Sequence, residues 1–193
     1  MVGVKGSYWV LGRNVSLQQL MATAYNFNLA RVVLPPDAPT NNFDFLVTTP
    51  SNPLEHLRLA VRKKIGYAAH PETRTADVLD LKVVDASLPG LTVSDASEKQ
   101  NVRFENRKLD FTHMPLEVIA NESERMLSTP VVDKLELTNF YDFSMVWNEQ
   151  TQRQMRNGTM TRDAMDKILA AWGLGLQADT ASIPVLLVER EAN

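Results

Sequence analysis

Hydrophobic residues recur along the chain at two spacings, which predict a mixture of helices and strands. Apolar residues three or four positions apart predict helices at residues 17–24, 54–65, 116–127 and 164–172. Runs rich in aromatic and β-branched residues predict strands at residues 8–11, 43–49, 108–112 and 183–189. Residues 67–84 alternate around a polar centre at Glu72-Thr73-Arg74-Thr75, so we expect a two-stranded hairpin there. The polar run from Gln150 to Thr161 predicts an exposed loop.

The order of these elements repeats after about one hundred residues. Val32-Val33 lies 99 positions before Val131-Val132, and the Asp44 tripeptide (FDF) lies 98 positions before the Asp142 tripeptide (YDF). After a further expansion of nine residues, 78–81 (VLDL) matches 185–188 (VLLV) at a separation of 107. Self-similarity on this scale indicates repeated structural units, each with its own hydrophobic face. We therefore expect an internal duplication.

The predicted elements give an α+β protein made of two similar lobes. Each lobe would pack two helices on a mainly antiparallel sheet, with the first lobe at residues 1–84 and the second at 102–193. Residues 85–101 contain Pro89, Gly90 and a polar run, which is the composition of a flexible linker.

Two segments resemble a known bacterial family. The segment from Pro130 to Phe143 (PVVDKLELTNFYDF) resembles a string in the second half of a family of domains of unknown function that is common in soil bacteria. The segment from His70 to Arg74 (HPETR) is similar to a hairpin in the first half of that family, with a departure at Pro71. The resemblance covers nearly the whole chain. It implies export from the cytoplasm, because members are typically exported and some are joined to envelope sensor proteins.

The order of elements in the repeat also resembles the short N-terminal domain of secretins and TonB-dependent receptors. Such domains bind other proteins in the periplasm, so this second resemblance implies a docking module. It is an analogy at the level of the fold, and a fold hosts many functions.

Composition narrows the possible partners. A net charge of -3 and a pI of about 5.6 lack the basic surface that nucleic-acid binding usually needs, so we expect no nucleic acid. The chain has no cysteine, which excludes disulfides, a thiolate nucleophile and sulfur-ligated zinc. No apolar stretch is long enough to span a membrane, and we expect no membrane insertion. A strand-like segment follows Met1 almost at once and no signal peptide is evident, as in a chain trimmed to a domain edge.

Residues with catalytic or metal-binding chemistry are few. The three histidines, His56, His70 and His113, do not have the spacing of metal ligands, and the serines lack a nucleophile motif. We therefore predict no metal, no cofactor and no enzymatic activity. The repeat does place Asp44 and Asp142 between aromatic residues in both copies. These carboxylates could contact solvent or backbone, or they could converge as an acid and base pair.

The sequence thus favours a non-enzymatic, extracytoplasmic protein-interaction module, belonging to a larger envelope protein. Exposed sheet edges, the hairpin at Thr73-Arg74-Thr75 and the loop Gln150–Thr161 are the predicted contact surfaces. The alternative is a domain that binds a small molecule or glycan in the cleft between the lobes, with Trp9 or Trp147 as a stacking surface.

Overall fold

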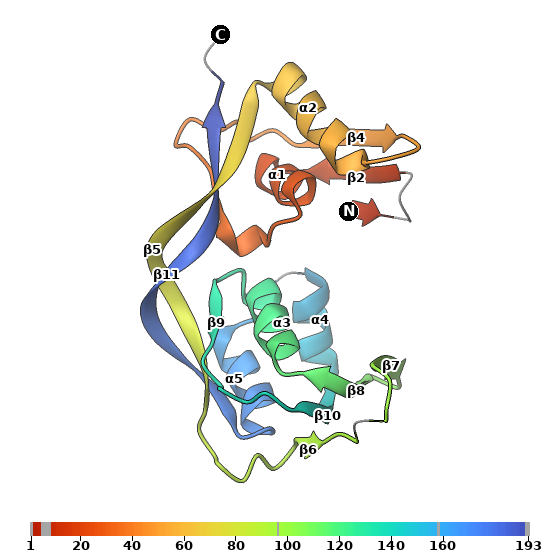
Figure 1. Ribbon diagram of the computed structural model, residues 1–193, viewed down its shortest axis with the longest axis vertical. Coiled ribbons are helices and arrows are strands. Elements are labelled where there is room, and N and C mark those ends of the chain that lie inside the picture. The colour runs from red at the N-terminus through yellow and green to blue at the C-terminus, as the bar shows by residue number, and fades with distance from the viewer. Residues whose placement is uncertain (1, 5–8, 96, 158, 192–193) are drawn as a thin grey trace. The chain divides into compact units, whose positions relative to one another are not determined.

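The computed structural model describes residues 2–4, 9–95, 97–157 and 159–191, which form two compact units (Figure 1). Unit 1 comprises Met1–Ala76 together with Ser182–Asn193, and unit 2 comprises Asp77–Ala181. Helices and mixed sheets occur in both units, so the predicted α+β class is confirmed. These units are divided at positions other than the predicted linker, since residues 85–95 and 97–101 belong to unit 2.

Unit 1 packs two helices on a three-stranded antiparallel sheet of order β1-β2-β4. The strands are β1 (Val2–Val4), β2 (Trp9–Val15) and β4 (Phe43–Thr48). The helices are α1 (Leu17–Tyr25) and α2 (Pro53–Ile65), with a short 3-10 turn η1 (Leu29–Arg31) before β3 (Val32–Val33). Ser16 starts α1 because its side chain accepts the backbone N–H of Gln19, and Gly66 ends α2 with a φ of 78°. The predicted strand at 8–11 begins at Tyr8, which lies outside the described residues.

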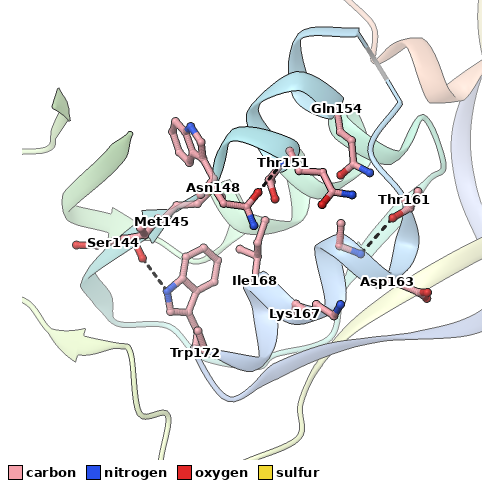
Figure 2. A pocket seen from close by; sticks show the side chains of 15 residues that line it. Ser144, Met145, Asn148, Thr151, Gln154, Thr161, Asp163, Lys167, Ile168 and Trp172 are labelled. Carbon is pink, nitrogen blue, oxygen red and sulfur yellow. Dashed lines mark hydrogen bonds between the residues drawn. The ribbon is translucent and has the colours of Figure 1, made fainter. Parts of the chain in front are cut away.

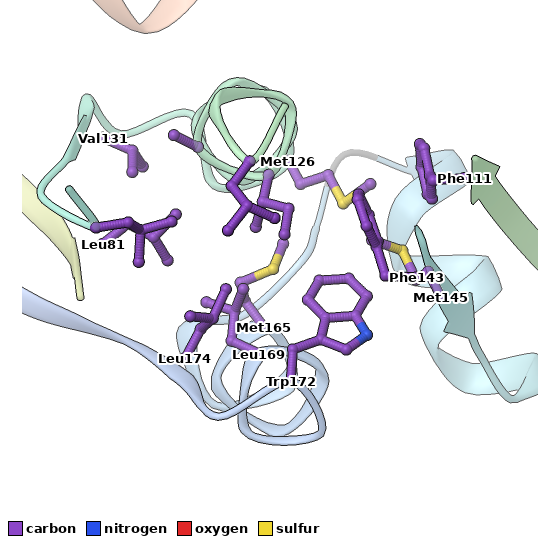
Figure 3. Packing of buried hydrophobic residues seen from close by; sticks show 14 of the residues in the cluster. Leu81, Phe111, Met126, Val131, Phe143, Met145, Met165, Leu169, Trp172 and Leu174 are labelled. Atoms are coloured by element: carbon purple, nitrogen blue, oxygen red, sulfur yellow. The ribbon is translucent and has the colours of Figure 1, made fainter. Parts of the chain in front are cut away.

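Unit 2 has a four-stranded antiparallel sheet of order β6-β10-β8-β7. Its strands are β6 (Thr92–Val93), β7 (Asn101–Glu105), β8 (Lys108–Pro115) and β10 (Phe140–Val146). Its helices are α3 (Glu117–Leu127), α4 (Glu149–Asn157) and α5 (Arg162–Ala170), and a short strand β9 (Val131–Asp133) follows α3. Met126, Met165, Leu169 and Trp172 meet in its hydrophobic core (Figure 3).

Two strands of 17 residues, β5 (Tyr67–Val83) and β11 (Leu174–Arg190), run through the division between the units. They are hydrogen-bonded neighbours in a sheet of order β3-β11-β5-β9. The N–H of Val84 donates to the carbonyl of Gly173, and the N–H of Glu191 donates to that of Gly66, both at 2.9 Å, so the two strands are antiparallel. Each unit therefore contains half of each long strand.

The short strands pair with the long strands at equivalent positions. In unit 1, β3 pairs in parallel with β11 through Val32 and Leu186. In unit 2, β9 pairs in parallel with β5 through Val131 and Leu79. Val131 lies 99 positions after Val32, and Leu186 lies 107 positions after Leu79, which are the separations of the sequence repeat. Each short strand thus pairs with the long strand that ends the other repeat.

Two predicted elements are wrong. The hairpin expected at residues 67–84 is the single strand β5, because no residue near Thr73-Arg74-Thr75 has the positive φ that a tight hairpin turn needs and threonine favours extended backbone. The loop expected from Gln150 to Thr161 contains helix α4. Asn148 starts this helix, since its side-chain oxygen accepts the N–H of Thr151 at 2.8 Å.

Candidate functional site

A cavity of about 400 Å³ lies in unit 2, where the end of β10 meets α4 and α5 (Figure 2). The helix starts hold its walls in place. The capping side chain of Asn148 lies at the start of α4, and Thr161 caps α5 by accepting the N–H of Ala164 at 3.3 Å. Both capping residues line the cavity. The volume falls within the range of small-molecule sites in proteins.

Two indole rings contribute to the apolar part of this cavity. Trp172, at 2% exposure, donates its Nε1–H to the carbonyl of Ser144 at 3.1 Å, which ties the end of α5 to β10. The edge of this indole packs on Phe143, with the ring centroids 5.3 Å apart. Trp147 also lines the cavity and is 9% exposed. Within the described part of the chain, its buried Nε1 has no hydrogen-bond partner.

Polar residues from the two helices complete the lining. Helix α4 contributes Gln150 and Gln154, one turn apart on the same face, and α5 contributes Asp163 and Lys167 with the same spacing. The cavity lining therefore combines neutral amides with one carboxylate and one ammonium group. Such a lining can bind a ligand that carries both apolar surface and hydrogen-bonding groups.

A second candidate surface is the free edge of the sheet at β7. The chain enters β8 through a two-residue turn in which Asn106 and Arg107 have φ values of 50° and 63°, as a type I′ hairpin turn requires. All of β7 is exposed, including Val102 (48%) and Phe104 (60%). Phe104 stacks on Trp147, with the ring centroids 5.8 Å apart and the planes 15° apart. An exposed edge strand with apolar side chains can pair with a strand from another chain.

The charges around β7 are paired with one another. Three ion pairs connect neighbouring side chains at 2.6 to 2.8 Å: Arg103 with Glu105, Arg107 with Glu149, and Lys108 with Asp110. The contact with Lys108, together with a hydrogen bond from the Ser144 hydroxyl, holds the pKa of Asp110 below its usual value. The edge therefore has little net charge.

The repeated aspartates each contact backbone within their own unit. Asp44 accepts the N–H of Asn14 at 2.6 Å, and Asp142 accepts that of His113 at 2.8 Å. Asn14 and His113 have φ values of 53° and 51°, and both lie where the register of the neighbouring strand shifts. A β-bulge leaves a backbone group unpaired, and the carboxylate satisfies it in both units. This geometry supports the backbone-contact interpretation of the two carboxylates.

The other predicted contact residues are distributed between the two units. Thr73, Arg74 and Thr75 are exposed on β5 in unit 1, and the Nε of Arg74 pairs with Glu72 at 3.1 Å. Asp44 is also in unit 1, whereas Asp142 and Trp147 are in unit 2. Of the residues predicted individually, Trp147 lines the cavity described above, and the predicted contact segment Gln150–Thr161 adds Gln150, Thr151, Gln154 and Thr161 to the same lining. Sequence reasoning predicted the segment that holds Gln150 and Gln154 as a contact surface but missed its helix, and it missed Phe104. The Asn148 cap and the positive-φ asparagine at 106 are the signals that could have found these two elements.

Neither a metal site nor a membrane span is found among the described residues. No three histidine or carboxylate side chains there come close enough together to hold a metal ion. None of the helices in those ranges combines the length and the apolar character needed to cross a bilayer.

Comparison with known proteins gives one match. No curated protein and no solved structure matches the chain. A family model described as "Protein of unknown function (DUF3738)" matches residues 18–190, which confirms the predicted membership of a family of domains of unknown function. The weaker resemblance to the secretin and TonB-dependent receptor domain stays a prediction. The chain belongs to the DUF3738 family.

Proposed function

We propose that this protein is a non-enzymatic interaction module that binds an extended segment of a partner protein along the edge of β7. The observation that carries the proposal is the exposure of the whole strand, with apolar side chains at alternate positions, Val102 and Phe104. Alternate residues of a strand share one face, so the two side chains form a continuous apolar strip. Strand addition at a sheet edge uses main-chain hydrogen bonds for affinity and such strips for specificity.

The backbone of β7 has free groups at the same two residues. Glu105 and Lys108 flank the two-residue turn, and flanking residues of such a turn hydrogen-bond to each other. Because the pattern alternates, the N–H and C=O groups of Val102 and Phe104 point away from β8. A partner strand would find its hydrogen-bonding groups and its apolar contacts at the same positions.

The packing of Phe104 on its neighbour favours a preformed binding site. Its ring lies against the indole of Trp147, a buried residue, so the position of the phenyl group is restrained before a partner arrives. Restraining a side chain beforehand lowers the entropy cost of binding. The local ion pairs leave the edge nearly neutral. The partner segment is therefore expected to be uncharged, with β-branched or aromatic residues at alternate positions.

The proposal can be tested with a random-peptide display library as the probe. The full chain should enrich extended peptides with alternating apolar residues, and their binding should slow hydrogen exchange at the amides of Val102 and Phe104. Phe104→Glu should abolish binding. Leu46→Glu is the matched control, because Leu46 is 64% exposed on the edge strand β4 of unit 1.

Either of two results would overturn the proposal. One is the absence of any enriched peptide. The other is a set of enriched peptides that bind the Phe104→Glu variant as tightly as the wild type, with no protection of β7 amides. Melting curves of both variants establish that each remains folded.

We also propose that the module works outside the cytoplasm, as part of a larger envelope protein. This proposal is supported by the family membership together with the export that the resemblance implies. Fractionation of a source bacterium that produces the natural protein would test it. Recovery of the protein from the cytoplasmic fraction alone would reject it.

A further proposal concerns the origin of the fold. We propose that the chain arose by duplication of one unit, followed by exchange of the terminal strand halves between the copies. It is supported by the equivalent pairing of β3 with β11 and of β9 with β5 at the separations of the sequence repeat. The same bulge, with its aspartate contact, also occurs at equivalent positions in both units.

A further inference from the structure

We infer that the cavity between β10, α4 and α5 is a binding site for a saccharide, separate from the β7 edge. The first observation is the chemistry of the α4 wall. Gln150, Thr151 and Gln154 offer amide and hydroxyl groups that both donate and accept hydrogen bonds. Vicinal hydroxyl groups of a sugar need partners of this kind, since each hydroxyl is itself donor and acceptor.

These amides are available to a ligand. Among the described residues, no protein hydrogen bond engages the side chains of Gln150 or Gln154. The amides and hydroxyls already used for folding, those of Asn148 and Thr161, lie at the helix starts. The cavity lining thus separates groups that hold the helices from groups that remain free.

The charges on the α5 wall favour a ligand without net charge. Asp163 and Lys167 both line the cavity one turn apart, and no ion pair joins them in the described structure. On the same helix and at the same spacing, Arg162 and Asp166 do pair, with Nε 2.9 Å from the carboxylate. The cavity therefore presents one free carboxylate and one free ammonium group, whose charges cancel. Both groups accept or donate hydrogen bonds to neutral hydroxyls.

The apolar part of the lining matches the carbon face of a sugar ring. Ile168 and the two indoles of Trp147 and Trp172 lie on the same cavity as the free amides. The Nε1–H of Trp147 is a donor without a partner in the described residues. A polar lining with indoles and no net charge fits a saccharide better than an anion, a cation or a purely apolar molecule.

The three tryptophans allow a direct test. In a two-dimensional NMR spectrum of the full chain, the indole N–H signals of Trp9, Trp147 and Trp172 are followed during titration. The probes are glucose, galactose, mannose, N-acetylglucosamine and their β-1,4-linked disaccharides. At least one sugar should shift the Trp147 and Trp172 signals in a saturable manner. Trp9, which lies in unit 1, should not move.

Variants of α4 locate the site. The double variant Gln150→Ala with Gln154→Ala should weaken binding about tenfold or more, because it removes hydrogen-bonding partners of the ligand. Gln152→Ala is the matched control, since this glutamine is on the same helix but does not line the cavity. Its affinity should equal that of the wild type.

Three outcomes would overturn the inference. In the first, no sugar shifts the two indole signals at concentrations up to about 0.1 M, a range that covers millimolar affinities. In the second, the double variant and the control bind equally well. In the third, free alanine or glutamine shifts the signals whereas sugars do not, which would assign the cavity to a zwitterion held by Asp163 and Lys167. No β7 residue lines the cavity, but Trp147 also supports Phe104, so the Gln150 and Gln154 variants distinguish saccharide binding from peptide binding at β7.

Discussion

Unit 1 and unit 2 share the same order of main elements and differ in the segments that connect them. In both, a strand with a bulge leads to a helix, a short strand, a second sheet strand, another helix and a long strand. Between the second sheet strand and the next helix, unit 1 has the short connection 49–52. The equivalent connection in unit 2 runs from 147 to 161 and contains α4.

A longer segment separates the long strand of the first repeat from the bulged strand β8 of unit 2. It covers residues 84–107 and contains β6, which pairs with β10, and β7, which pairs with β8 as β1 pairs with β2 in unit 1. Helix α4, which forms one wall of the cavity, is therefore particular to unit 2 among the described elements, whereas the edge strand that carries Phe104 has a counterpart in β1. The comparison teaches that the candidate cavity depends on a helix absent from the described part of unit 1, whereas the candidate β7 edge belongs to a strand position that both sheets have and is distinguished by its exposed apolar side chains. Binding residues often lie on such connections, positioned by a rigid scaffold.

The largest effect is expected from two alternative fragments of the chain, one bounded by the compact unit and one by the sequence repeat. A fragment of residues 77–181 retains unit 2 with the β5 half that pairs with β9. A fragment of residues 102–193 contains the second repeat but lacks Leu81, a core residue with 0% exposure. Loss of one buried leucine side chain costs about 2–5 kcal/mol, against a total stability of about 5–15 kcal/mol, and here a whole strand is lost.

We expect the 77–181 fragment to be a monomer with a cooperative melting transition. The 102–193 fragment should have no cooperative transition as a monomer. Circular dichroism and size-exclusion chromatography would measure both. If the 102–193 fragment is a monomer and melts cooperatively, unit 2 does not need the half of β5 that pairs with β9. That result would contradict the proposed exchange of strand halves.

A smaller effect is expected from the carboxylates that both units share. Asp142→Ala should lower the free energy of unfolding by about 1–3 kcal/mol, because it leaves the half-buried N–H of His113 without its acceptor. Asp44→Ala should cost less, about 0.5–1.5 kcal/mol, because water can reach the exposed Asn14 contact. Urea denaturation would measure both, with Asp77→Ala at an exposed aspartate of β5 as the control.

Substitution of Asp44 and Asp142 by asparagine tests whether these residues act as hydrogen-bond acceptors or through their negative charge. Asparagine keeps an oxygen acceptor, so Asp44→Asn and Asp142→Asn should recover much of the lost stability. Unchanged stability in the alanine variants would reject the backbone-contact role of these aspartates.

The sequence was most informative where local chemistry decides the structure. The apolar stripe of residues 17–24 predicts α1, and the capping box found at Ser16 explains why the helix begins there. The predicted hairpin at Thr73-Arg74-Thr75 is wrong, because polar residues do not by themselves specify a turn. A tight turn needs residues that can adopt positive φ angles, as Asn106 and Arg107 do. A strand can contain polar residues wherever its side chains are exposed to solvent.

The candidate cavity could not be predicted from the sequence repeat, because helix α4 has no equivalent among the described elements of the first repeat. Residues 150–161 were assigned to a loop because they are polar, although helices can be polar when one apolar residue such as Met155 packs on the core. Trp147 was recognised as a candidate by residue type alone. Its place on the cavity follows from the packing of α4 and α5, which no local pattern specifies.

The smallest expected effect concerns a charge that unit 2 has and unit 1 lacks. Asp110 lies 99 positions after Leu11, so the repeat has no carboxylate at the equivalent position. Lys108, with Nζ 2.6 Å from Oδ1, and the Ser144 hydroxyl keep the pKa of Asp110 below its usual value. A lowered pKa in the folded state stabilises the fold above the unfolded pKa of about 3.9, and this contribution is lost as the pH falls through the folded pKa. Asp110→Asn should therefore lower the melting temperature slightly at pH 7.

The difference between Asp110→Asn and the wild type should shrink below about pH 4 and vanish in stronger acid, because the wild-type carboxyl is then protonated as well. Lys108→Gln should remove most of the same pH dependence, since Lys108 is the main cause of the lowered pKa. Melting curves between pH 2 and pH 7 would measure both variants. A melting-temperature difference between Asp110→Asn and the wild type that does not change with pH would mean that Asp110 acts through its shape and hydrogen bonds. Its negative charge would then add no stability to unit 2.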